Sequence, residues 1–154
     1  MSFQDNIDYI RRRIKKTAKH FGTGEPDTQI IAVTKKQPLP KIRESLEAGH
    51  RIYGENRVQD ASKVWNSAEG FKSEFDDIEL HLIGPLQTNK VKDAVALFDC
   101  IQTLDREKLA DALKAEMDKQ GRTLKILVQV NTGEESQKSG VAPNDLGDLL
   151  THCQ

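Results

Sequence analysis

Strand-like and helix-like segments alternate along the whole chain of 154 residues, and this alternation restricts the possible folds more than any other feature. The strand-like segments are short apolar runs, and the helix-like segments repeat apolar residues every three or four positions. Repeated strand–helix units predict an α/β fold with a parallel sheet. Strands are expected at residues 30–33, 50–54, 79–83, 100–104 and 124–130, with helices at about 3–14, 41–48, 57–67, 89–97, 106–120 and 143–153.

Three local patterns sharpen this assignment. The first helix has an apolar stripe that we expect to face the core, formed by Phe3, Ile7, Ile10 and Ile14. The run from Ile30 to Val33 is apolar at every position, which predicts a strand buried on both faces. Gly49 and Gly121 follow two of the helices and are the residue type that commonly ends a helix.

The sheet could be an open doubly wound sheet or a closed (β/α)₈ barrel. The first strand–helix turn, from Thr34 to Pro38, has no glycine fingerprint, which argues against a dinucleotide-binding fold. A barrel of about 250 residues uses roughly 31 per unit, so this chain has room for about five units. We therefore predict a partial TIM-type (β/α) barrel, with an N-terminal helix and about five parallel strand–helix units. Residues 1–154 would form a single incomplete domain, truncated at its C-terminal end.

The composition limits the classes of partner. The chain has 23 basic and 24 acidic residues, so it has no overall field to attract a polyanion, and we expect no nucleic-acid partner. The basic run from Arg11 to Lys16 is interpreted as the solvated face of a helix. Cys100 and Cys153 show no metal-ligand spacing and are expected to be core thiols. The sequence shows neither a signal peptide nor a membrane span, so a cytoplasmic location is expected.

Ligands of parallel α/β folds bind at the carboxyl ends of the strands. Lys35 directly follows the first strand, and partial burial there would favour the free amine over the ammonium form. A free lysine amine is the group that attacks an aldehyde to form a Schiff base. The alternative is a lysine that extends from the strand end into solvent. Lys36 competes for the same role, but strand alternation should send it to the opposite face.

Other strand ends supply further candidates, each with a structural alternative. Asn56 could hydrogen-bond a planar ligand, or it could cap the following helix. His81 lies inside the third strand and is a cofactor-binding candidate, although a hydrogen-bonded core histidine is the commoner case. Residues 87–89 could receive an anion at a helix start or simply cap it. The charged loop 131–140, which contains Lys138, suggests a hinged lid or a solvated loop.

Four of these segments together resemble a known family. They are residues 31–35 (IAVTK), 53–56 (YGEN), 81–90 (HLIGPLQTNK) and 137–140 (QKSG). In this order, at successive strand ends, they are similar to the pyridoxal-phosphate homeostasis protein family, which has an alanine-racemase-like N-terminal barrel. The resemblance covers essentially the whole chain.

The resemblance implies a barrel that binds pyridoxal 5'-phosphate (PLP), with Lys35 as the Schiff-base lysine. It also implies that Asn56 lies near the cofactor ring and that Lys138 is a second lysine at the mouth. It implies a non-catalytic carrier or regulator of PLP within vitamin B6 homeostasis, with PLP-dependent apoenzymes as candidate partners. The family's phosphate-binding segment, rich in Ser, Gly, Thr and Arg, has no match here.

Two alternatives remain open. The first is a PLP-dependent amino-acid racemase or decarboxylase of the same fold, which would need a second acid/base group that is not evident in the sequence. The second is an incomplete domain without a cofactor. We expect a monomer for the full-length form, whereas unpaired edges on the first and fifth strands could lead fragments to associate. Neither a membrane nor a metal ion is an expected partner.

Overall fold

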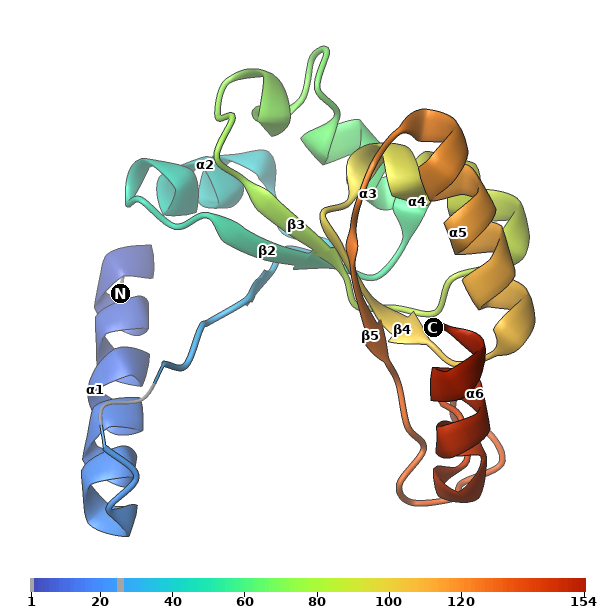
Figure 1. Cartoon of the computed structure of the whole chain (residues 1–154). Helices are drawn as coiled ribbons and strands as arrows, with labels where there is room; N and C mark the ends of the chain where they lie inside the picture. Colours follow the sequence, from blue (N-terminus) through green and yellow to red (C-terminus); the bar gives the residue numbers. More distant parts are fainter. Residues whose placement is uncertain (1, 25–26) are drawn as a thin grey trace.

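The computed structural model describes residues 2–24 and 27–154. Its centre is one parallel sheet of five strands in the order β1-β2-β3-β4-β5 (Figure 1). The strands are β1 (Ala32–Val33), β2 (Ile52–Glu55), β3 (Glu79–Leu82), β4 (Cys100–Leu104) and β5 (Lys125–Val128). Sequential order with helical connections is the arrangement of a TIM-type barrel, so the predicted partial barrel is confirmed.

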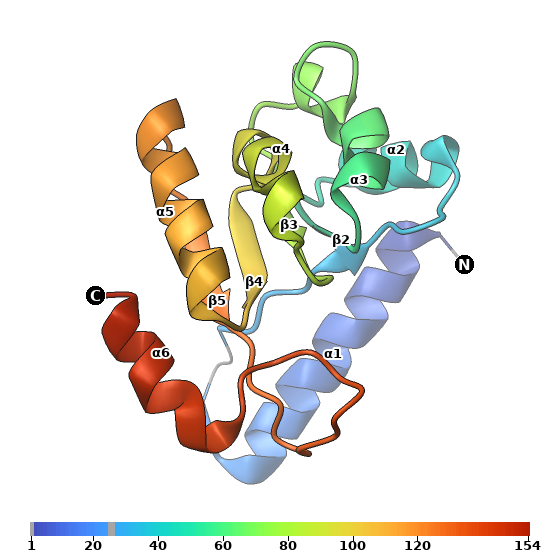
Figure 2. The same ribbon diagram turned by 90° about the vertical axis from the view of Figure 1, so that its right-hand side faces the viewer.

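The α-helices of the described residues follow the predicted order. They are α1 (Phe3–Phe21), α2 (Leu39–Glu47), α3 (Val58–Trp65), α4 (Val91–Leu97), α5 (Glu107–Gln120) and α6 (Leu146–His152). Short 3₁₀ turns η1 (Phe71–Ser73), η2 (Thr88–Lys90) and η3 (Pro143–Asp145) lie between them. Helices α2 to α5 cover one face of the sheet, while α1 and α6 stand on either side of its other face (Figures 1 and 2).

The core lies between the sheet and helices α2 to α5. Tyr53, Leu80 and Ile101 alternate with residues of the opposite face and are fully buried against the helices. The indole of Trp65 packs on the Tyr53 ring with centroids 4.7 Å apart. These residues belong to one continuous hydrophobic cluster, so burial of this single face holds the strands in register.

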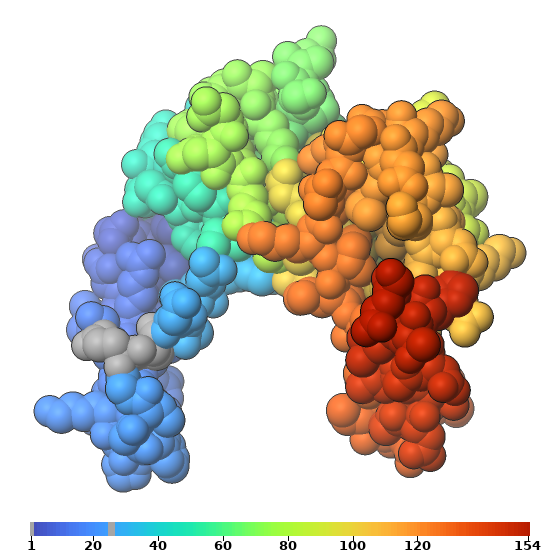
Figure 3. Space-filling model, in the orientation of Figure 1, coloured from blue at the N-terminus to red at the C-terminus, as the bar shows by residue number. Residues whose placement is uncertain are grey.

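The opposite face of the sheet is not covered by helices of the described residues and is open at both of its edge strands. Val33 is 44% exposed and Leu127 is 50% exposed, one on each edge strand. Figure 3 shows a hollow below the sheet, between the segments that contain α1 and α6. The prediction that residues 30–33 are buried on both faces is therefore wrong for Val33, because only one face of the sheet is covered by helices.

The first helix is capped at both ends but packs only in part. Ser2 and Asp5 form a capping box at its start, and Gly22 closes its end with φ of 66°. Of the predicted apolar stripe, Ile7 is buried whereas Ile10 is 41% exposed. The inward position expected for Ile10 is wrong, since most of α1 lies away from the sheet (Figure 1). The basic run 11–16 is largely on the exposed side of α1.

Glycine ends two helices as predicted. Gly49 follows α2 with φ of 86°, and Gly121 follows α5 with φ of 63°. The helix after β2 begins at Val58, with Arg57 at the N-cap position, and no side chain caps it. The alternative that Asn56 caps this helix is therefore wrong, which leaves its side chain available for another role.

Cys100 is buried as expected, whereas Cys153 is exposed near the end of α6, and both are free thiols. No described helix combines the length and apolar character needed to cross a membrane. Within residues 2–24 and 27–154, no cluster of three or more His, Cys, Asp or Glu side chains is placed to bind a metal ion.

Candidate functional site

The carboxyl ends of β1 and β2 bring Lys35 next to Asn56. Val33 pairs with Gly54 in the sheet, and the Thr34 amide still donates to the Gly54 carbonyl at 3.2 Å. Two residues further along each strand are Lys35 and Asn56, which therefore occupy neighbouring positions on the rim. The sequence prediction that these strand ends share one edge is confirmed.

Lys35 lies in a tight turn rather than on an extended strand. The Gln37 amide donates to the Thr34 carbonyl at 3.0 Å and closes the turn. Lys35 is exposed, so the partly buried surroundings expected for its amine are not present in the described residues. Lys36 has a left-handed backbone with φ of 57°, so strand alternation does not determine the direction of its side chain.

A buried carboxylate fixes the start of this turn. Oε1 of Glu55, a residue only 3% exposed, accepts a hydrogen bond of 2.5 Å from the Thr34 hydroxyl. The same oxygen accepts a bond of 3.2 Å from the indole N–H of Trp65. A buried charge needs such donors, because water does not reach it. Glu55 thus links the last residue before Lys35 to the helix layer.

The end of β3 approaches the end of β2 so closely that only glycine fits. A β-carbon on Gly84 would lie 2.2 Å from the Asn56 carbonyl oxygen, far inside van der Waals contact. Gly84 belongs to the segment 81–90 and Asn56 to the segment 53–56, which the sequence singled out separately. The requirement for glycine at residue 84 is therefore tied to the backbone position of Asn56.

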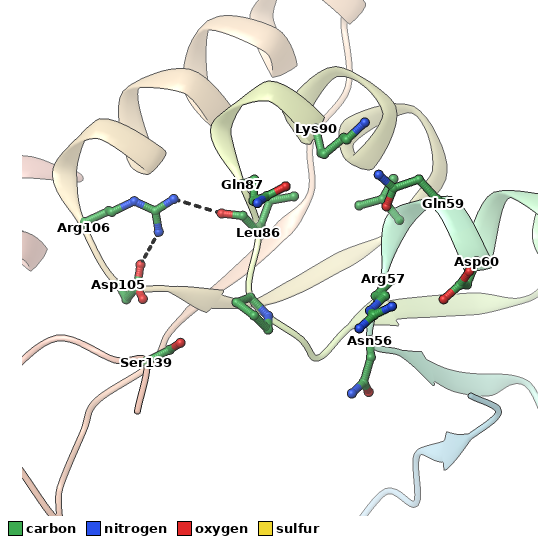
Figure 4. A pocket seen from close by; sticks show the side chains of 12 residues that line it. Asn56, Arg57, Gln59, Asp60, Leu86, Gln87, Lys90, Asp105, Arg106 and Ser139 are labelled. Atoms are coloured by element: carbon green, nitrogen blue, oxygen red, sulfur yellow. Dashed lines mark hydrogen bonds and ion pairs between the residues drawn. The ribbon is translucent and has the colours of Figure 1, made fainter. Parts of the chain in front are cut away.

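A cavity of about 820 Å³ opens on the rim beyond Asn56. Figure 4 shows its lining, contributed by the residues that follow β2, β3 and β4 and by the loop after β5. Three basic side chains line it, those of Arg57, Lys90 and Arg106. The amides of Asn56, Gln59 and Gln87, the carboxylates of Asp60 and Asp105, and Ser139 also line it.

Hydrogen bonds between successive strand ends fix the positions of the segments that line this cavity. The Thr103 hydroxyl donates to the Gly84 carbonyl at 2.9 Å, and Arg106 donates to the Leu86 carbonyl at 2.9 Å. Asp105 binds Arg106 at 2.6 Å through one oxygen and accepts the Gly140 amide at 3.3 Å through the other. The rim is therefore cross-linked from β3 to the loop that follows β5.

His81 lies below the rim, on the open face of the sheet, in a chain of polar side chains. Its Nε2 is 3.1 Å from Oε1 of Glu79, and its Nδ1 is 2.8 Å from the amide nitrogen of Gln102. Lys125 donates to the same Glu79 oxygen at 2.9 Å. These contacts lower the pKa of Glu79, mainly through the hydrogen bond from Lys125. Both ring nitrogens of His81 thus have partners within the protein, as the core interpretation expects.

Lys138 lies in the charged loop at the other end of the rim. Its ammonium is 2.6 Å from Glu135, and its side chain is 62% exposed. Lys138 and Glu135 both line a second cavity of about 350 Å³, which shares the lining residues Pro85 and Ser139 with the larger cavity. The Asn131 side chain donates to the Glu135 carbonyl at 2.9 Å and braces the loop.

Three of the four predicted site residues, Lys35, Asn56 and Lys138, lie along one edge of the sheet, and the four do not line a single cavity. Asn56 lines the larger cavity, Lys138 the smaller one, and Lys35 neither, while His81 lies deeper on the sheet. Sequence reasoning missed Arg106, which lies two residues beyond the end of the fourth strand. The rule that residues after a strand end reach the rim would have found Arg106 if it had been applied to this strand as well.

Comparison with known proteins places this arrangement in a family. The family model described as "Alanine racemase, N-terminal domain" matches residues 6–154. A pyridoxal phosphate homeostasis protein of Haemophilus influenzae is 33% identical over 154 residues, covering 100% of this chain and 64% of that protein. The chain thus spans about two thirds of the length of this relative.

Solved structures show the same likeness. PipY of Synechococcus elongatus, determined without PLP, is 36% identical and superposes with a TM-score of 0.75, covering 91% of this chain and 64% of PipY. PipY with PLP bound gives a TM-score of 0.71 over 90% of this chain and 62% of PipY. With a family model that matches nearly every residue, the chain belongs to the alanine racemase N-terminal domain family.

Proposed function

We propose that this protein binds PLP at the rim of the partial barrel and acts in PLP homeostasis as a non-catalytic carrier or regulator. The observation that carries the proposal is the position of Lys35, an exposed amine at the carboxyl end of β1 and next to Asn56. The similarity to pyridoxal phosphate homeostasis proteins and to PipY with PLP bound supports it. Because the chain spans about two thirds of these relatives, the proposal concerns the site that its own residues provide.

The residues present fit an aldehyde cofactor with a planar ring. PLP supplies an aldehyde, to which a lysine amine can attach as a Schiff base with release of the aldehyde oxygen as water. In our proposal Lys35 provides that amine, and its solvent exposure leaves it accessible. The Asn56 amide lines the rim and has no hydrogen-bond partner among the described residues, so it is free to hold a polar group of the ring.

The two other candidates would act more indirectly. The Lys138 ammonium is paired with Glu135 at 2.6 Å, so it must leave this partner before it can contact a cofactor. We propose that Lys138 receives or releases PLP at the mouth rather than holding it. His81 has partners at both ring nitrogens, and we propose that it supports the sheet surface below the cofactor.

Borohydride trapping tests the central assignment. The purified chain is mixed with PLP, its imine absorption is recorded, and the complex is reduced and mapped by peptide mass spectrometry. We expect the reduced adduct on Lys35 and loss of the imine band in Lys35→Ala. The matched control is Lys36→Ala, which alters the next residue of the same turn. An adduct mainly on another lysine, or a band that persists in Lys35→Ala, would refute the assignment.

A racemisation assay separates the carrier from an enzyme. We expect no turnover of several L-amino acids above the rate of free PLP. Turnover approaching about 1–10³ per second would instead support the amino-acid racemase alternative.

A further inference from the structure

The larger cavity on the rim has an uncompensated positive lining. Of its three basic side chains, only Arg106 forms an ion pair within the part of the chain that the structure describes, and its partner is Asp105. Arg57 and Lys90 have no ion-pair partner among the residues that the structure describes. Asp60 is the remaining acidic lining residue, and it lies outside ion-pair distance of both. The cavity can therefore accept negative charge without displacing an existing partner.

The placement of these groups is suited to one small ligand. Lys90 extends from η2 toward Gln59 on α3, and Arg57 lies below them beside Asn56 (Figure 4). Arg106 is on the far side of the cavity, held by the Leu86 carbonyl and Asp105. Amide groups between the cations offer both donors and acceptors. A volume of about 820 Å³ admits an organic molecule rather than only a bare ion.

We propose that this cavity is a binding subsite for a small organic carboxylate. The Arg57 guanidinium has the planar geometry that binds a carboxylate through two parallel hydrogen bonds, and Lys90 adds a point charge to the lining of the same cavity. Gln59 and Gln87 bind the neutral polar part of the molecule. Lys35 does not line the cavity, so the subsite goes beyond the proposed cofactor attachment and does not depend on it.

Calorimetric titration with succinate, without PLP, tests the subsite. We expect saturable binding that weakens at high salt, since salt screens the attraction between partly exposed charges. Arg57→Gln and Lys90→Gln should each weaken binding by about tenfold or more, because each removes a charge-assisted hydrogen bond. Succinamide, which has the same carbon skeleton without charge, should not bind.

Lys92→Gln is the matched control, since this exposed lysine lies two residues from Lys90 but outside the cavity. It should bind succinate as the unaltered chain does, and so should Lys35→Ala. Thermal unfolding of each variant shows whether it is folded before its titration is interpreted.

Other outcomes overturn the proposal. If succinate does not bind, the cavity is not a carboxylate subsite. The same conclusion follows if all charge-removing variants, including Lys92→Gln, weaken succinate binding equally. If inorganic phosphate or PLP binds there in place of succinate, and Arg57→Gln weakens that binding, the lining serves a phosphate group instead. Failure of Lys35 trapping would leave the succinate result untouched, so the two proposals fail separately.

Discussion

Thr34 and Glu55 are joined by a hydrogen bond of 2.5 Å that links the residue after β1 to the last residue of β2, directly below the rim. Each lies immediately before a candidate site residue, Lys35 in one case and Asn56 in the other. The carboxylate is buried and also holds the Trp65 indole. The same interaction therefore sets the spacing of the two strand ends and anchors them to the core.

Removal of the Thr34 hydroxyl should destabilise the protein. Thr34→Val keeps the shape of the side chain but leaves the buried Glu55 carboxylate with one donor fewer, at a cost of about 1–3 kcal/mol. Urea unfolding measures this loss. Thr123→Val, at an exposed position before β5, is the control and should change the unfolding free energy little. Equal effects of the two changes would mean that the Thr34–Glu55 bond contributes nothing.

Gly84→Ala should destabilise the protein and move Asn56. The added methyl would lie 2.2 Å from the Asn56 carbonyl oxygen, so one of the two strand ends must shift. Overpacking of this kind costs about 1–3 kcal/mol or more. Gly147→Ala in α6 is the control, because its methyl meets nothing within 4 Å, and helix propensity predicts a gain of roughly 0.5–1 kcal/mol. A neutral Gly84→Ala would contradict the close approach.

Substitutions at Lys36 should follow backbone preference rather than charge. Its φ of 57° is left-handed, a conformation that costs a residue with a β-carbon about 1–2 kcal/mol. Lys36→Gly should therefore be tolerated, whereas Lys36→Val should be clearly destabilising, because β-branched residues rarely adopt this region. Thermal unfolding of the two variants compares them. If Val and Gly were equivalent, the turn would not need a left-handed residue at this position.

The contribution of His50 to stability should decrease as the solution is acidified through the histidine range. Burial lowers the pKa of His50 below its ordinary value of 6.5, despite a hydrogen bond with the Ile52 carbonyl. At His50 the unfolded chain then binds more protons than the folded one just below pH 6.5, so this residue favours unfolding as pH falls. His152 acts in the opposite direction, since Asp111 raises its pKa and its contribution is lost as pH rises.

Urea unfolding at several values between about pH 5 and 7 measures this dependence. In a His152→Gln background, His50→Gln should flatten it, because the glutamine keeps a donor for Ile52 but does not titrate. A slope that survives the double substitution would show that another group is responsible.

The order of the elements was predictable because it depends on local pattern. The strand from Cys100 to Leu104 has the predicted boundaries, since an aspartate flanks it on each side, Asp99 before it and Asp105 after it. Gly49 and Gly121 end helices because few other residues adopt positive φ without cost. These features depend on a few neighbouring residues, which a sequence displays directly.

Features that depend on distant partners were predicted less well. Val33 and Ile10 have the apolar character of core residues, but the described chain places little against them. Arg57, Lys90 and Arg106 line one cavity although they follow three different strands. The distances between them are set by the packing of those strands in the sheet, which the sequence does not display. The exposure of Lys35 results from a turn closed by Thr34 and Gln37, and its two central residues, Lys35 and Lys36, are not of the types that favour a turn.

The open face of the sheet has a calorimetric consequence. Heat capacity rises on unfolding because apolar surface becomes hydrated, by about 12–15 cal/mol/K per residue in ordinary domains. Here Val33 and Leu127 already contact water in the folded state, with 44% and 50% of their surface exposed. Scanning calorimetry should therefore give a smaller heat-capacity increase on unfolding per residue, and a flatter curve of stability against temperature, than in ordinary domains. The reason is that part of this apolar surface is already hydrated in the folded state.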